Sequence, residues 1–396
     1  MKKKILFVIP SLEIGGAEKS LINLLNEIDY SRYEVDLFLM SKTGLFLKQL
    51  PKQVIVLAES EAFKNFSKRF HLSLLRFLKK KEFNLLWNKI NFTIANKLIN
   101  NPVKSEQKNW KYLKHFFPVI NKKYDVAIGY LEKNSNYIVA DCVIAEKKIG
   151  WIHTDLEQLK IDFNLEEKNF EKMDFMVTVS NGLTERLKHL LPNYSNKIVT
   201  IENISSKKAI WRQADDLIEE YRNPDFVNII FVGRLETVKN LDSAIDAIYI
   251  LLKKNLNVHF HIIGEGSQKE ILKQKINNLG ISNNIFFYGI KINPYPYIKN
   301  ADIFILTSNY EGKSISLEEA KILNKPIVIT NFSSAKDQII NGITGLIADK
   351  NAESIAENIE RLIRDDELRK VLIQNLTKMN TSTEHEIEKL YQLIES

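Results

Sequence analysis

The sequence predicts an α/β protein of two domains, each with a doubly wound parallel sheet, that face each other across a cleft. The length of 396 residues suits two domains of ordinary size better than one. Short β-branched runs alternate with helical patterns through most of the chain, which is typical of parallel strands joined by crossover helices. A polar stretch at residues 204–225 contains no such run and divides the strands into two sets.

The two sets of strands define the expected domains. We expect a first domain over residues 1–203, a junction over 204–225, a second domain over 226–380, and a helix over 381–396 that returns to the first domain. Apolar residues at helical spacing near the end of the chain indicate that last helix. The predicted strands are Ile5–Ile9, Val35–Met40, Val54–Leu57, Val126–Gly129, Ile149–Ile152, Phe175–Val179 and Ile198–Ile201, then Val227–Val232, Val258–Ile263, Ile285–Tyr288, Ile303–Leu306 and Ile327–Ile329.

The composition narrows the class of protein. Cys142 is the only cysteine, so neither a disulfide nor a Cys-rich zinc site is expected. Residues 2–9 form a basic tip and a short apolar run that ends at Pro10 without a cleavage site, which favours a buried strand over a signal peptide. No run approaches ~18 consecutive apolar residues. We therefore expect no transmembrane helix and a cytoplasmic protein.

One segment, residues 63–123, is strongly basic. It contains fifteen Lys or Arg and two Glu, a net charge of +13, so the rest of the chain carries −6 of the total of +7. Aromatic residues are threaded through the charges, and we expect a basic helical insert over about 62–123. Two interpretations stay open: a solvated insert whose aromatics pack on the domain, or a patch that binds an anionic membrane surface. Nucleic acid is not an expected partner, because no nucleic-acid motif accompanies the charge.

Ligand-binding residues are expected in the loops after the strands, because doubly wound sheets bind ligands outside the carboxyl ends of their strands. After the first strand, Gly15 and Gly16 lead into a helix, where paired glycines let the backbone approach a phosphate. After the first strand of the second domain, Arg234 and Lys239 supply two cations. Together these cations can neutralise a leaving diphosphate.

The loop and helix start at residues 306–320 give the strongest local signal. Two acids, Glu311 and Glu319, lie in it, and carboxylates are strong acceptors for sugar hydroxyl protons. Gly312 and Ser314 can offer N–H groups to phosphate or sugar oxygens. Complementation of a helix dipole would explain one Glu at a helix start but not the whole loop.

With these loops, the chain resembles the retaining GT-B glycosyltransferases of glycosyltransferase family 4, whose two domains are Rossmann-like. The matching motifs run in the order of the family over nearly the whole chain. They are Gly15-Gly16-Ala17-Glu18, Trp151-Ile152-His153, Val179-Ser180, Gly233-Arg234-Leu235 with Lys239-Asn240, Gly264-Glu265-Gly266, Glu311 to Glu319 with Ala320, and Lys325-Pro326-Ile327-Val328.

The resemblance implies that a nucleotide diphosphate sugar, the donor, lies mainly on the second domain. Arg234 and Lys239 would grip the diphosphate, and Glu319 would hold the ribose hydroxyls. Glu311 would face the transferred sugar, with His153 of the first domain beside it. The further donor contacts implied are Gly15, Gly16, Gly233, Gly264, Gly289, Ile290, Gly312, Lys313 and Ser314, with the base near Gly289 and Ile290 and backbone N–H groups offered by Gly16, Lys313 and Ser314.

The activity that the resemblance implies is sugar transfer with retention of anomeric configuration. Retention in this family is attributed to same-face attack assisted by the leaving phosphate, with His153, Arg234, Lys239 and Glu311 as the implied catalytic residues. The implied acceptor is a glycan or lipid-linked glycan of bacterial surface polysaccharide or glycolipid synthesis. No cofactor or metal is expected, since the chain lacks the Asp-x-Asp pair of metal-dependent GT-A transferases.

Two features set this chain apart from the family pattern. The family often has an aromatic residue and a glycine where Lys313 and Ser314 stand, which leaves the donor sugar open. The basic segment is also longer than a minimal first domain needs. The alternative functions are a nucleotide-sugar epimerase or phosphorylase on the same fold, and a non-catalytic nucleotide-sugar-binding protein.

Overall fold

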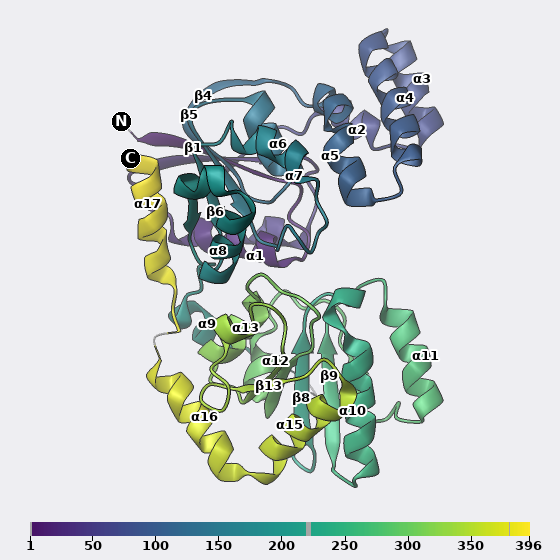
Figure 1. The fold of residues 1–396 in the computed structure, drawn as a ribbon, viewed down its shortest axis with the longest axis vertical. Coiled ribbons are helices and arrows are strands. Elements are labelled where there is room, and N and C mark those ends of the chain that lie inside the picture. The colour runs from purple at the N-terminus through teal and green to yellow at the C-terminus, as the bar shows by residue number, and fades with distance from the viewer. Residues whose placement is uncertain (1, 219–222, 380) are drawn as a thin grey trace. The chain divides into compact units, whose positions relative to one another are not determined.

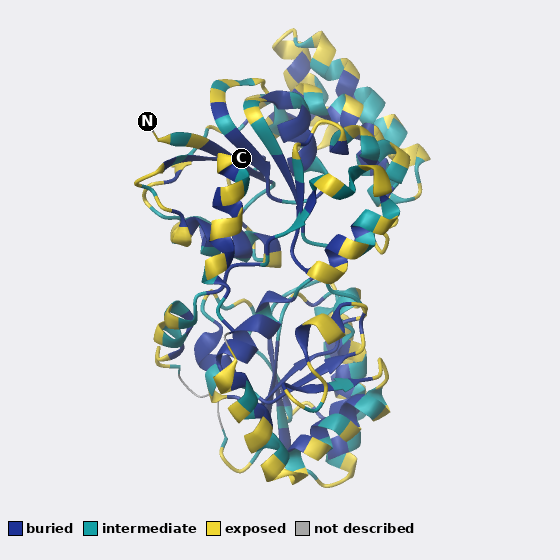
Figure 2. Ribbon diagram, turned by 60° about the vertical axis from the view of Figure 1, so that its left-hand side comes forward, coloured by how far each residue is buried: buried dark blue, intermediate teal, exposed yellow. Residues whose placement is uncertain are grey.

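The computed structural model describes residues 2–218, 223–379 and 381–396. The chain forms two compact units (Figure 1). Unit 1 consists of Met1–Glu202 together with Glu386–Ser396, and unit 2 of Asn203–His385. In each unit, helices cover a parallel sheet whose strands are buried along most of their length (Figure 2).

The sheet of unit 1 has seven parallel strands in the order β3-β2-β1-β4-β5-β6-β7. The winding reverses between β1 and β4, so the loops after these two strands flank the switch point where such sheets bind ligands. Ile5 to Ile9 in β1 are fully buried, as expected of a continuous apolar run covered on both faces. The strands are β1 (Lys3–Ile9), β2 (Tyr33–Leu39), β3 (Ile55–Val56), β4 (Ile120–Gly129), β5 (Val143–Ile152), β6 (Phe175–Thr178) and β7 (Ile198–Thr200).

The helices of unit 1 fall into two groups. One group covers the sheet, and the other forms the basic insert, in which α3 and α4 lie side by side at the edge of the unit (Figure 1). Because β4 begins at Ile120, residues 120–123 belong to the sheet, although we expected them in the insert. The first group is α1 (Gly16–Glu27), α6 (Asn134–Cys142), α7 (Phe163–Phe170) and α8 (Asn181–Leu190); the insert is α2 (Glu61–Phe66), α3 (Phe70–Lys79), α4 (Phe83–Leu98) and α5 (Pro102–Leu113).

The C-terminal helix α17 (Ile387–Glu395) packs on unit 1, as the sequence predicted. Its buried face includes Tyr391, whose ring stacks on that of Tyr33 with centroids 5.0 Å apart. At its end, Glu395 pairs with Lys3 at 3.0 Å. Helix α17 therefore contacts the first residues of β1 and β2.

The sheet of unit 2 has six parallel strands in the order β10-β9-β8-β11-β12-β13. Here the winding reverses between β8 and β11. The short strand β13 was not predicted. The strands are β8 (Val227–Val232), β9 (Val258–Ile263), β10 (Ile285–Phe287), β11 (Ile303–Leu306), β12 (Ile327–Thr330) and β13 (Leu346–Ala348).

The helices of unit 2 include one within the stretch that we expected to be a junction. Residues 207–214 form α9, whose Ile210 and Ala214 are buried in the core of unit 2. Residues 219–222 of that stretch lie outside the described residues. The helices are α9 (Lys207–Ala214), α10 (Leu241–Lys253), α11 (Lys269–Leu279), α12 (Tyr295–Asn300), α13 (Ile315–Ile322), α14 (Ala335–Gln338), α15 (Ala352–Arg364) and α16 (Asp366–Lys378).

Candidate functional site

Two loops meet at the switch point of unit 2, and each contributes a charge. Lys239, at the end of the β8–α10 loop, places its Nζ 2.5 Å from Oε1 of Glu311 in the β11–α13 loop. Ser308 donates a hydrogen bond to the same carboxylate oxygen at 2.6 Å. The side chains of Lys239 and Glu311 are only 15% and 13% exposed. The pair is therefore largely shielded from water. Coulomb attraction between the two charges is stronger in such a place than at an open surface.

Backbone contacts hold these two loops together. The N–H of Asn309 donates to the carbonyl of Val238 at 2.7 Å, and the hydroxyl of Thr307 donates to the carbonyl of Lys239 at 2.9 Å. Ser334, just before α14, donates to the carbonyl of Glu311 at 2.9 Å. These bonds hold the main chain at Lys239 and Glu311, so the positions of both residues do not depend on the ion pair between their side chains.

The other cation of the β8–α10 loop, Arg234, is exposed and forms no ion pair with any residue that the structure describes. The backbone beside it is tightly packed. Gly264, with φ of +144°, lies so close that a Cβ there would meet the carbonyl oxygen of Gly233 at 1.9 Å. Only glycine fits at position 264. The guanidinium therefore projects from a rigid loop and is available to an anion.

Gly289 and Ile290, the predicted contacts to the base, follow β10. Gly289 has a φ of +64°, and its carbonyl accepts a hydrogen bond from the N–H of Gly264 at 2.8 Å. Ile290 is exposed. The loops after β8, β9 and β10 therefore lie side by side along one edge of the sheet.

Ser314 caps α13 and Glu319 lies in the middle of that helix, and both form hydrogen bonds within the protein. Glu319 is buried, and its Oε1 accepts a hydrogen bond from the hydroxyl of Tyr295 at 3.1 Å. Ser314 caps the helix through its hydroxyl, and its backbone N–H donates to Oε1 of Gln338 at 2.9 Å. The N–H that we expected to reach phosphate or sugar is thus already used within the protein. Gly312 is buried and Lys313 is partly buried.

In unit 1, Gly15 and Gly16 begin α1 after β1. Gly15 is the N-cap residue and Gly16 the first residue of the helix. A Cβ at Gly15 would come within 2.1 Å of the Glu18 carboxylate, the end of a flexible side chain. The helix has no side-chain cap, so its first N–H groups face the region after β1.

The loop after β5 carries His153, and its neighbours come from the loop after β4. The backbone N–H of His153 donates to Oε2 of Glu132 at 3.0 Å. The ring centroids of His153 and Tyr130 lie 5.1 Å apart. Burial lowers the pKa of His153 to about 3, so the imidazole is neutral at physiological pH. Burial likewise raises the pKa of the Glu132 carboxyl. Nε2 of His153 is buried and lacks a hydrogen-bond partner among the described residues.

The residue after Glu132 has an unusual backbone. Lys133 has a φ of +65°, which L residues other than Asn and Asp rarely adopt. Its ammonium lies 2.5 Å from the carboxylate of Glu106 in α5, which also accepts a hydrogen bond from Asn134 at 2.7 Å. Such conformations persist where surrounding contacts impose them, and they concentrate at functional sites.

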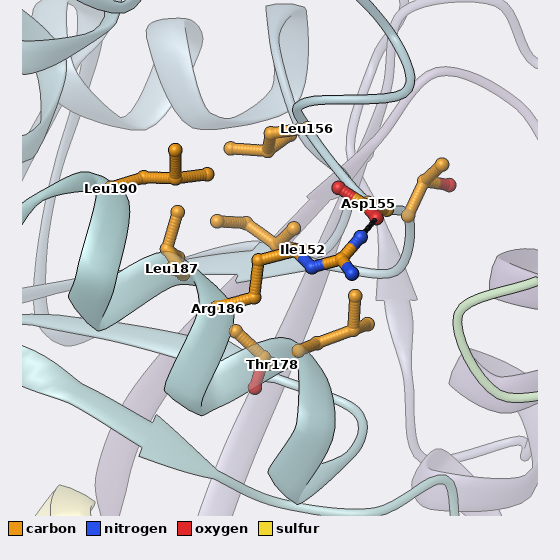
Figure 3. Close-up of a pocket in the computed structure, with 9 residues that line it drawn as sticks. Ile152, Asp155, Leu156, Thr178, Arg186, Leu187 and Leu190 are labelled. Carbon is orange, nitrogen blue, oxygen red and sulfur yellow. Dashed lines mark hydrogen bonds and ion pairs between the residues drawn. The ribbon is translucent and has the colours of Figure 1, made fainter. Parts of the chain in front are cut away.

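An ion pair anchors the chain on the other side of His153. Asp155 lies two residues after His153. Figure 3 shows its ion pair with Arg186 of α8, beside a hollow that is lined mainly by apolar side chains. Asp155 is only 2% exposed. The hollow beside this pair has a volume of about 10 Å³, which is enough for one water molecule at most. We therefore assign it to packing and not to substrate binding.

Several of these residues were missed by the sequence analysis. Tyr130 and Glu132 lie within three residues after the predicted strand Val126–Gly129, and Ser308 lies two residues after Ile303–Leu306, so position after a strand was a usable signal. Tyr295 gave none, because only the folded chain brings α12 to α13.

Comparisons with known proteins bear on both the fold and this site. Residues 214–379 match the family model described as glycosyl transferases group 1. The matched region contains both loops of the charged pair. The chain is 30% identical over 214 residues to the Staphylococcus aureus capsular polysaccharide biosynthesis glycosyltransferase CapM. The match covers 51% of this chain and 56% of CapM. It is 30% identical over 141 residues, 35% of this chain, to a poly(ribitol-phosphate) alpha-N-acetylglucosaminyltransferase of Staphylococcus aureus strain COL. The chain spans 28% of the length of that relative.

Solved structures match over the whole chain. Anabaena HepE in complex with UDP and glucose superposes with a TM-score of 0.71 at 15% identity, covering 99% of each chain. Staphylococcus aureus TarM superposes with a TM-score of 0.67 at 16% identity, covering 100% of this chain and 99% of TarM. These likenesses confirm the predicted GT-B fold.

Among the described residues, no helix has the length and apolar character that crossing a bilayer requires.

Proposed function

We propose that this protein is a retaining glycosyltransferase of the family 4 type, which moves a sugar from a nucleotide diphosphate sugar to a glycan or lipid-linked glycan. The observation that carries the proposal is the shielded Lys239–Glu311 pair at the switch point of unit 2, within the region that matches glycosyl transferases group 1. A cation and a carboxylate held side by side suit a ligand that presents phosphate and hydroxyl groups together.

In the proposed reaction, the bond between the anomeric carbon and the diphosphate breaks while the acceptor hydroxyl attacks from the same face. Negative charge grows on the leaving diphosphate, where Lys239 and Arg234 stabilise it, and the leaving phosphate takes the proton of the acceptor. Glu311 binds hydroxyls of the transferred sugar, and Glu319 holds the ribose. His153, which is neutral, exchanges hydrogen bonds with the sugar, and Gly15 and Gly16 offer N–H groups to the phosphate.

The relatives suggest the substrates. UDP occupies HepE, and the Staphylococcus aureus relatives are named for capsular polysaccharide and for a poly(ribitol-phosphate) polymer. We therefore propose a nucleoside diphosphate donor of the UDP type and an acceptor from bacterial surface polysaccharide or glycolipid synthesis. The enzyme would work in the cytoplasm, at the inner face of the plasma membrane where lipid-linked acceptors are presented.

The test is incubation with a panel of nucleotide sugars, with and without acceptor glycans, while release of nucleoside diphosphate is measured. Release that depends on acceptor supports transfer. Conversion of one nucleotide sugar to another without acceptor would show an epimerase instead, and binding without reaction would show a non-catalytic protein. Because side chains supply the cations in this proposal, the rate should not change in EDTA; a loss that magnesium or manganese restores would contradict that part.

A further inference from the structure

Helix α4 carries an exposed apolar stripe. Phe83, Trp87, Ile94 and Leu98 are 63%, 66%, 53% and 78% exposed. Their spacing of four, seven and four residues places them on one face of the helix. Leu72, Leu75 and Leu78 of the adjacent helix α3 are exposed as well. We call these seven residues the α3–α4 face; within the part of the chain that the structure describes, they remain open to solvent.

The opposite face of α4 already anchors the helix to unit 1. Phe92 packs edge-to-face on Phe66 with centroids 4.9 Å apart, and Lys89 donates to the carbonyl of Phe66 at 2.8 Å. Phe66 in turn contacts Phe116 in the core. The inward aromatics of the basic segment therefore pack on the domain, as one of our two interpretations expected. The α3–α4 face is not needed for that packing, so its apolar character calls for a separate explanation.

Exposed lysines border the α3–α4 face. Lys79 is the last residue of α3, and Lys80 and Lys81 lie in the turn before α4, between Leu78 and Phe83. Lys80 lies 3.4 Å from Glu61, whereas Lys79 and Lys81 form no ion pair among the described residues. An apolar ridge bordered by exposed lysines is the pattern of a helix that lies in the interface of an anionic bilayer.

We propose that the α3–α4 face docks on an anionic lipid surface, with Phe83 and Trp87 entering the headgroup region and the lysines of the turn contacting lipid phosphates. A second copy of this chain fits less well, because residues 70–98, which include both helices, carry six Lys or Arg against one Glu, so each copy would bring a net charge of +5 to the same interface. Only the purpose of this docking, which is to bring the site to a lipid-linked acceptor, rests on the proposed function.

Vesicle flotation of the full chain tests the proposal. Vesicles of phosphatidylcholine mixed with phosphatidylglycerol should bind the protein, and pure phosphatidylcholine should bind it much less. The double substitution Phe83→Glu and Trp87→Glu should weaken binding by at least about tenfold, because two exposed aromatics lose their apolar burial. Ile271→Glu, at an equally exposed position of α11 in unit 2, is the matched control and should bind normally. Binding should fall as salt is added.

Equal binding to neutral and anionic vesicles, or none to either, would overturn the proposal. So would self-association in sedimentation velocity that the double substitution abolishes while vesicle binding is absent, since that result would assign the face to a second copy. Transfer to a water-soluble acceptor should be the same in the double variant and the wild type. Absence of transfer in both would instead count against the proposed function and leave the vesicle result to stand on its own.

Discussion

The polar groups at the carboxyl ends of the two sheets differ in charge. In unit 2, Lys239 and Glu311 form an ion pair shielded from water. In unit 1, burial keeps His153 neutral and raises the pKa of the Glu132 carboxyl. Both sets follow strands that flank or adjoin a switch point, so topology alone does not set the charge. From this difference we expect the charged pair of unit 2 to serve a charged group such as diphosphate, and the His153 loop of unit 1 to serve neutral hydroxyl groups.

The largest expected effect is the loss of charge in unit 2. Lys239→Met should lower kcat by roughly 100- to 1,000-fold, because a preorganised charge no longer stabilises the leaving diphosphate. It should also lower the free energy of unfolding by about 1–3 kcal/mol, because the largely buried carboxylate of Glu311 loses its ion-pair partner. Steady-state kinetics and urea unfolding measure the two effects.

The double variant Lys239→Met with Glu311→Gln is the control for this substitution. Removing both charges should recover much of the stability, because no unpaired carboxylate remains, yet it should not recover turnover. Recovery of turnover together with stability would mean that the pair serves folding alone.

The two acids of unit 2 should differ from each other. Glu319→Ala should chiefly weaken nucleotide binding, because ribose hydroxyls are bound equally in the ground and transition states, whereas Glu311→Ala should chiefly lower kcat. Calorimetric titration with nucleoside diphosphate, beside kinetics, separates the two. Equal losses of nucleotide affinity in both variants would refute these roles.

In unit 1, Glu132→Ala should lower kcat by about tenfold with little change in nucleotide affinity, because the N–H of His153 loses its acceptor and the ring loses its fixed position. Glu132→Gln keeps a carbonyl oxygen that can accept this bond and should retain most of the activity. If Glu132→Ala shifted nucleotide affinity as strongly as turnover, the residue would belong to the donor site instead.

The last expected effect concerns the pH dependence of stability. Folding lowers the pKa of His153 from 6.5 to about 3, so its contribution to stability is complete above pH 6.5 and is lost as pH falls toward 3. The free energy of unfolding should therefore fall between pH 6.5 and 4 less steeply in His153→Gln than in the wild type. His261, whose pKa is lowered to about 4, acts in the same window, and His261→Gln provides the comparison. A kcat profile with an inflection near pH 6.5 that His153→Gln removes would show that His153 titrates.

Much of this arrangement could be read from the sequence, for identifiable physical reasons. Parallel strands buried on both faces leave continuous apolar runs, so twelve of the thirteen strands that the structure describes were predicted, and charges in the loops after them marked Lys239 and Glu311. The contacts of Glu319 with Tyr295 and of Ser314 with Gln338 join segments that are apart in the chain, and no local pattern shows them. The two apolar faces of α4 were also hidden, because periodicity marks an apolar residue without telling whether a neighbour covers it.

The central claim is that the charged pair of unit 2 serves a retaining transfer. Proton NMR of the reaction with an α-configured nucleotide sugar tests it most directly, since the coupling constant of the new anomeric proton reports the configuration of the product. We expect an α-linked product from the wild type and almost none from Lys239→Met in the same time. A β-linked product, or the same yield from Lys239→Met as from the wild type, would contradict it.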